Sequence, residues 1–118
     1  MATQPPQTFS DLLAAAARFR DDRDWARFHT PKDLAAAVAI EASELQEIFL
    51  WSESDARVEE MTRHRVEEEL ADVLIHCANL ALALDIDVPS ALAAKFEANA
   101  AKYPIERARG KATKYTDL

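Results

Sequence analysis

The chain has 118 residues, 49% of them hydrophobic, one glycine and a formal net charge of −7. This length predicts a single domain, residues 1–118, and the acidic charge disfavours a protein that coats nucleic acid, so we expect no nucleic-acid partner. Nucleotide substrates stay open, because bound divalent cations offset negative charge. No apolar run has membrane-spanning length and nothing resembles a signal peptide, so we expect a cytoplasmic protein without a membrane partner.

The N-terminal part predicts a flexible start and one helix. Residues 1–7 are polar and contain prolines, which is typical of a mobile tail. Thr8 or Ser10 can cap a first helix that extends to about Asp22. Residues 23–29 follow as an aromatic-rich connection.

A strong helix start comes next. Thr30 is followed by Pro31, and Asp33 stands three residues after the threonine, the arrangement of a capped first turn. This second helix is predicted to run to about Trp51. The polar residues 52–59 then form a loop.

The C-terminal half predicts two further helices. A third extends from about Glu60 to Leu84, residues 85–90 interrupt it, and a fourth reaches about Lys102. The basic residues 105–118 are predicted to be a flexible tail. The fold class is therefore all-α, a bundle of about four main helices. Because alanine-rich helices bury little apolar volume each, we expect a homodimer or homotetramer.

The second helix carries acids on its apolar face. At about 100° per residue its core stripe is formed by Leu34, Val38, Leu45 and Ile48. Glu41 falls inside this stripe, and Glu44 lies on its edge, one turn along.

The third helix repeats the pattern. Its predicted stripe is formed by Val66, Leu70, Val73, Cys77, Leu80 and Leu84. Glu69 borders the stripe, and Asp72 and His76 continue on the same side. Each of these two helices thus carries a carboxylate pair at i, i+3 beside its apolar face.

Carboxylates gathered near a core need compensation, since unpaired buried charges are unfavourable and like charges repel. They are protonated, paired with arginine or lysine, or bound to a cation; oxygen ligands suit Mg²⁺ or Mn²⁺. The alternative is that these acids are solvated surface residues. A ferritin-like di-iron bundle needs Glu-x-x-His on two helices. The residues three before the histidines are Ala26, Met61 and Val73, so this signature is missing.

The acid pairs Glu41-Ala-Ser-Glu44 and Glu69-Leu-Ala-Asp72 resemble the E-x-x-E…E-x-x-D signature of the MazG-like all-α pyrophosphohydrolases. The surrounding sequence, from about Phe9 to Leu118, is similar to the dCTP pyrophosphatase branch of that family. The stretches that carry this likeness are Arg23-Asp-Trp25, Phe28-His29, Phe49-Leu-Trp51, Glu68-Glu-Leu-Ala-Asp-Val-Leu-Ile75, Lys102-Tyr-Pro104 and Lys114-Tyr-Thr116.

The resemblance implies cleavage of a deoxynucleoside triphosphate between its α and β phosphates, with dCTP or modified dCTP favoured. It also implies assembly as a dimer or tetramer with sites between subunits. The Mg²⁺ ions would be held by Glu41, Glu44, Glu69 and Asp72, with Mn²⁺ as a substitute. Either Glu41 or Glu44 would take the proton of the attacking water.

The same likeness implies a base pocket. Trp25 and Trp51 match tryptophans expected to enclose the base, with His29 nearby; the alternative for each tryptophan is core packing. In the fourth helix Asn99 falls within an apolar stripe that includes Tyr103, and a buried amide needs partners. We list four substrate-binding candidates there: Lys95, Asn99, Lys102 and Tyr103. Solvated lysines and a satisfied structural amide are the alternatives.

One position departs from the branch, which usually reads Leu-Ile-Tyr after the last acid where this chain has Leu74-Ile75-His76. His76 can bind phosphate, ligate a metal or be structural, and the substitution bears on substrate preference. Two other functions stay open. One is a related pyrophosphohydrolase of the dUTPase-like or phosphoribosyl-ATP type, and the other is a non-catalytic helical interaction module.

Overall fold

A computed structural model describes residues 4–50 and 60–118. Over these ranges the secondary structure consists of α-helices and short 3₁₀ turns, which confirms the all-α prediction. The chain divides into two compact units, Met1–Ile86 and Asp87–Leu118, and each is described by itself. No helix in the described part is long and apolar enough to cross a membrane.

The first helix, α1 (Phe9–Asp22), is capped by Thr8 rather than Ser10. The backbone N–H of Asp11 donates to Thr8 Oγ1 at 3.1 Å, which satisfies one of the free amides of the first turn. A 3₁₀ turn, η1 (Ala26–Phe28), lies within the predicted aromatic connection.

The second helix, α2 (Pro31–Ile48), begins as predicted, with the N–H of Asp33 donating to Thr30 Oγ1 at 3.2 Å. It ends at Ile48, earlier than the predicted end at Trp51. The N–H groups of Phe49 and Leu50 donate to carbonyls three residues back, so the last turn tightens into a 3₁₀ pattern. Trp51 itself lies outside the described residues.

The third helix, α3 (Glu60–Leu84), has the predicted bounds. Asp85 follows it in a left-handed conformation, with φ 52°. The N–H of Ile86 donates to the carbonyl of Ala81, five residues back, at 2.9 Å, which is the wider hydrogen bond of a Schellman motif.

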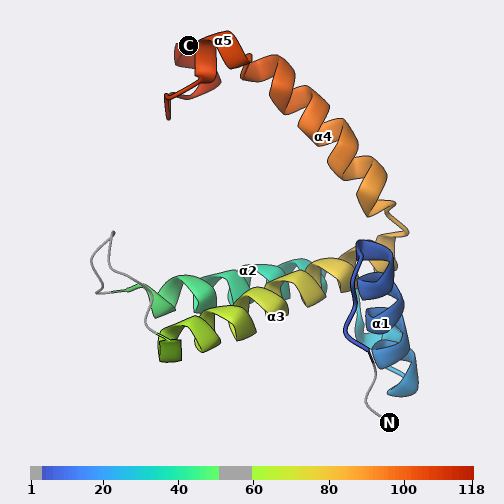
Figure 1. Cartoon of the computed structure of the whole chain (residues 1–118). Coiled ribbons are helices and arrows are strands. Elements are labelled where there is room, and N and C mark those ends of the chain that lie inside the picture. The colour runs from blue at the N-terminus through green and yellow to red at the C-terminus, as the bar shows by residue number, and fades with distance from the viewer. Residues whose placement is uncertain (1–3, 51–59) are drawn as a thin grey trace. The chain divides into compact units, whose positions relative to one another are not determined.

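Helices α2 and α3 lie side by side and run in opposite directions (Figure 1). Helix α1 packs against the C-terminal part of α3, which lies beside the start of α2. The predicted stripe of α2 is confirmed. Leu34 is buried, and half-buried residues follow at Val38, Glu41, Leu45 and Ile48.

The inner face of α3 differs from the predicted stripe. Its less exposed residues include Val66, Glu69, Val73, His76 and Leu80. Leu70 of the predicted stripe is 47% exposed and Leu84 is 50% exposed. Because α3 carries apolar residues on more than one face, periodicity alone cannot decide which face meets α2. Glu69 and His76 therefore lie within the inner face, not beside it.

The second unit contains α4 (Val88–Lys102), α5 (Ile105–Ala108) and a 3₁₀ turn, η2 (Tyr115–Asp117). Asp87 caps α4 by accepting from the N–H of Ser90 at 3.2 Å. The segment predicted as a flexible tail folds back here. The rings of Tyr103 and Tyr115 meet edge to face at 5.9 Å, and Arg107 donates to the carbonyl of Leu118.

Candidate metal and nucleotide site

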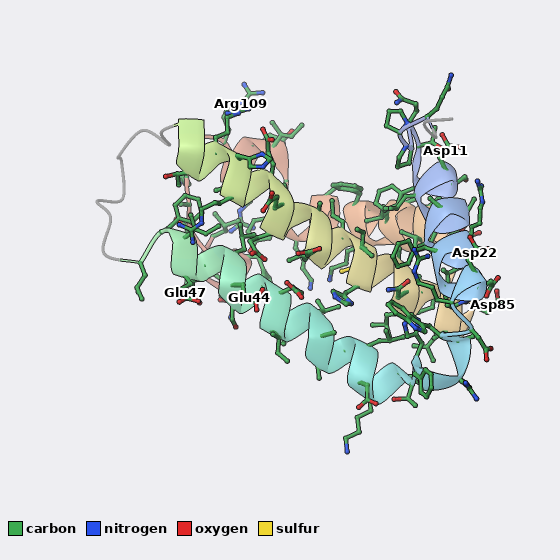
Figure 2. The ribbon with its side chains drawn as sticks, turned by 90° about the horizontal axis from the view of Figure 1, so that it is seen from below. Asp11, Asp22, Glu44, Glu47, Asp85 and Arg109 are labelled. Carbon is green, nitrogen blue, oxygen red and sulfur yellow. The ribbon has the colours of Figure 1, made fainter. Side chains whose placement is uncertain are left out.

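Three predicted metal ligands converge between α2 and α3. Glu41 comes from α2, and Glu69 and Asp72 come from successive turns of α3. Each offers one carboxylate oxygen, and the three oxygens lie within 4.8 Å of one another. Glu44, labelled on α2 in Figure 2, is more exposed and lies outside this trio. A single small cation can touch the three clustered oxygens.

Part of the acidic trio has no compensating partner in the described part of the chain. Glu41 Oε2 and Glu69 Oε2 are buried there without a hydrogen-bond donor. The nearest basic atom to Glu41 among the described ion pairs is His76 Nε2, 3.6 Å from Glu41 Oε1. Buried anionic oxygens without donors are unfavourable. The donor set and its orphaned oxygens therefore fit a divalent cation with a preference for oxygen, such as Mg²⁺.

The electrostatics of the cluster lead to the same conclusion. The pKa of Glu41 is raised to about 7, first by the hydrogen bond it shares with Glu44, then by burial and by the charges of Glu44, Asp72 and Glu69. The pKa of Glu69 is also raised, first by burial and then by the charge of Glu44. Glu44 thus belongs electrostatically to the cluster. A proton or a cation must neutralise part of this charge.

This shift predicts how the metal-free protein responds to pH. Glu41 has a reference pKa of 4.5, so between about pH 4.5 and 7 the folded protein holds more protons than the unfolded chain. The stability must then fall as pH rises through that range. We expect the melting temperature measured in chelator to decline from pH 5 to 7.5, and less steeply in Glu41→Gln. If Glu41→Gln left the pH dependence of the melting temperature unchanged, the raised pKa of Glu41 would be contradicted.

A cavity of about 390 Å³ adjoins the cluster in the first unit. Its wall contains two predicted base-binding residues, Trp25 and His29, whose ring centroids lie 6.4 Å apart. Asp72 and His76 of α3 form another part of it, so Asp72 belongs both to the acidic trio and to the cavity wall. The full lining is Pro6, Leu12, Ala15, Ala16, Phe19, Arg20, Trp25, His29, Asp72, Ile75, His76 and Asn79.

His76, the position that departs from the family text, connects these two features. Its Nε2 faces Glu41, its ring lines the cavity, and its Nδ1 is buried with no partner among the described residues. His76 thus lies where the cavity meets the acids.

Two polar residues of the cavity wall, Arg20 and Asn79, were not among the predicted site residues. Arg20 pairs with Asp21 at 2.8 Å. Asn79 is 9% exposed and is the buried polar residue of the described core. A signal for Asn79 was available, because a residue three positions after His76 and seven after Asp72 shares their side of an α-helix.

The other predicted substrate residues do not belong to the described residues of the first unit. Trp51 lies outside the described residues. Four candidates stand on or next to α4 in the second unit, where Asn99 is half-buried and Lys102 Nζ lies 4.9 Å from the Tyr115 ring centre. The four are Lys95, Asn99, Lys102 and Tyr103.

Comparison with known proteins gives consistent matches. Residues 36–118 match the MazG-like family. The chain is 40% identical to dCTP pyrophosphatase 1 of Rattus norvegicus and 36% identical to that of Homo sapiens. Each alignment covers 97% of this chain and 69% of the relative. A pyrophosphatase crystal structure from Archaeoglobus fulgidus superposes with a TM-score of 0.76 and 39% identity, over 88% of this chain and 99% of that one.

Proposed function

Because this chain belongs to the MazG-like family, we propose that it is a metal-dependent nucleoside triphosphate pyrophosphohydrolase that favours dCTP or a modified dCTP. In the reaction a water molecule attacks the α-phosphorus, the bond to the bridging oxygen of the β-phosphate breaks, and a monophosphate and pyrophosphate leave. The observation that carries the proposal is the trio of converging carboxylates, with two orphaned oxygens, beside a cavity of ligand size.

In this proposal Mg²⁺, with Mn²⁺ as a substitute, is held by Glu41, Glu69 and Asp72 together with Glu44. When bound, the ion supplies charge neutralisation for the triphosphate and a lower pKa for water. Glu44 or Glu41 accepts the proton of the attacking water. The hydrogen bond that Glu41 and Glu44 share sets both carboxylates in the same cluster and supports this role.

The protein's other side chains orient the nucleotide. Trp25 offers an aromatic face in the cavity wall for stacking on the base, with His29 beside it. Asp72 belongs both to the cavity wall and to the acidic trio. A nucleotide whose base occupies the cavity would therefore direct its phosphates toward the acids. We assign Trp51 to substrate binding as well, on the family resemblance. The four α4-region candidates are assigned on the apolar stripe that contains Asn99 and Tyr103 and that Lys95 and Lys102 flank.

The substrate assignment rests on the relatives named dCTP pyrophosphatase 1. A cytoplasmic location, where nucleotide pools are kept, is part of the proposal. The test is a pyrophosphate-release screen with Mg²⁺ over the common nucleoside triphosphates and 5-substituted dCTP analogues. We expect dCTP or a modified dCTP to give the highest kcat/KM. A clear preference for dUTP would favour the dUTPase-like alternative, and no release from any nucleotide would refute the proposal.

We also propose that the active protein is a homodimer or homotetramer. In the first unit, the large apolar side chains of Leu70, Leu74 and Leu84 on α3 are exposed. Large apolar side chains that share one side of a helix and stay exposed are typical of an association site. Sedimentation at micromolar concentration is expected to show a dimer or tetramer. An active monomer under those conditions would contradict this.

A further inference from the structure

Asn79 is a polar side chain whose burial the fold does not explain. It lies on α3 among the alanines Ala78 and Ala81, and 9% of its surface is exposed. No hydrogen bond joins its amide to a described residue. Unlike the enclosed Nδ1 atoms of His29 and His76, the amide of Asn79 is not sealed off from the cavity that it lines.

Such an amide is costly to bury unless something pairs with it. Backbone and side-chain partners are missing in the described part of the chain, and the open side is the cavity. Water or a ligand in the cavity can therefore supply the partner that the described residues do not.

Several other polar groups of the cavity wall face partners among the described residues. Arg20 pairs with Asp21 at 2.8 Å, Asp72 belongs to the acidic trio, and His76 Nε2 faces Glu41. His29 stands beside the Trp25 ring, and its Nδ1 is enclosed. Asn79 thus offers a donor and an acceptor, neither paired with a described residue, on a mostly apolar wall.

We propose that Asn79 is a specificity-determining residue that hydrogen-bonds the polar edge of the nucleobase in this cavity; this rests on the proposed function. A carboxamide presents one acceptor oxygen beside an NH₂ donor. Cytosine presents the complement, an exocyclic amino group that donates beside a ring N3 that accepts. The Oδ1 atom of Asn79 accepts from the amino group, and its Nδ2 atom donates to N3.

The experiment combines a protein variant with a substrate variant. Asn79→Leu keeps the approximate volume and removes both hydrogen-bonding groups. The matching substrate is the deoxyribosyl 2-pyrimidinone triphosphate, which is dCTP without its 4-amino group. Wild-type KM is expected to be roughly tenfold higher for the truncated substrate, as for loss of about one hydrogen bond. In Asn79→Leu the KM for dCTP is expected to rise at least tenfold, and the two substrates should then differ by less than about twofold, since coupled groups are non-additive.

A structural role predicts something else. Removing an unpaired buried amide should leave the melting temperature unchanged or raise it, whereas removing a structural hydrogen bond lowers it. Gln46→Leu removes an exposed amide on α2, away from the cavity, and is expected to change neither KM nor base preference.

The outcomes separate this inference from the proposed function. If the wild type releases pyrophosphate but Asn79→Leu keeps the wild-type KM and discrimination, the amide contacts only water and the inference is overturned. If the wild type hydrolyses no nucleotide, calorimetric binding of dCMP decides independently. At least tenfold weaker dCMP binding in Asn79→Leu supports the inference, and equal binding overturns it.

Discussion

Asp72→Asn is expected to abolish pyrophosphate release while leaving the helical spectrum and melting temperature nearly unchanged. Asp72 supplies one oxygen of the acidic trio and also stands on the cavity wall. The substitution keeps the shape of the side chain and removes one negative charge from a self-repelling cluster. The folded protein therefore loses little stability. The cation, in contrast, loses an anionic ligand, and a bound cation contributes several kcal/mol to catalysis of such reactions. A fall in kcat/KM on the order of a hundredfold or more follows.

Glu44→Gln sharpens this test. Glu44 lies outside the oxygen trio, yet it is the first cause of the raised pKa of Glu41. If Glu44 ligates the ion or takes the proton, its loss is expected to be as severe as that of Asp72→Asn. Calorimetric Mg²⁺ titration then separates the two roles, because loss of a proton acceptor lowers kcat with little change in Mg²⁺ affinity.

The matched control is Glu47→Gln, one helical turn further along α2 and exposed (Figure 2). It removes the same charge from the same helix and should retain activity within about twofold, as surface substitutions usually do. Activity like that of the wild type in both Asp72→Asn and Glu44→Gln would refute the metal site.

The starts of α1, α2 and α4 could be predicted because their signals are local. Thr8, Thr30 and Asp87 each accept from an N–H three residues on, and such caps depend on neighbouring sequence alone. The rotation of α3 could not be predicted in this way. Its apolar residues occupy several faces, so the packing of α2 and α1 decides that Glu69 and His76 lie inside while Leu70 is exposed.

The acidic residues of the site could be predicted from the sequence, because their pattern also depends on single helices. Glu41 interrupts a clear apolar stripe, and the i, i+3 spacing of Glu69 and Asp72 is a property of one helix. That Trp25 and Asn79 line the same cavity could not be predicted in this way. The two residues are far apart in the sequence, and only the tertiary fold brings them to one cavity. Asn79 lies on the Asp72 side of α3, but an amide in an apolar run carries no family signature.

Trp25→Ala is the sharpest test of the base pocket. Trp25 lines the cavity beside His29, and the edge contact between Phe19 and Trp25, with ring centres 5.9 Å apart, fixes its ring. Stacking on a base contributes about 1–3 kcal/mol, so its loss should raise KM for the preferred triphosphate roughly tenfold or more. The acids are untouched, so kcat and Mg²⁺ affinity should change much less. Trp25→Phe, which keeps an aromatic face, is expected to be intermediate.

The control for Trp25→Ala is Phe28→Ala in the same connection. Phe28 is 60% exposed, lies under the Arg27 guanidinium at 4.9 Å and is not part of the cavity wall. It should leave KM within about twofold, as a surface substitution does. Trp25 is itself 44% exposed, so its truncation should cost the fold little, and thermal melting will show whether it does. If Trp25→Ala binds nucleotide as tightly as the parent, the base lies outside this cavity and the assignment of its wall fails.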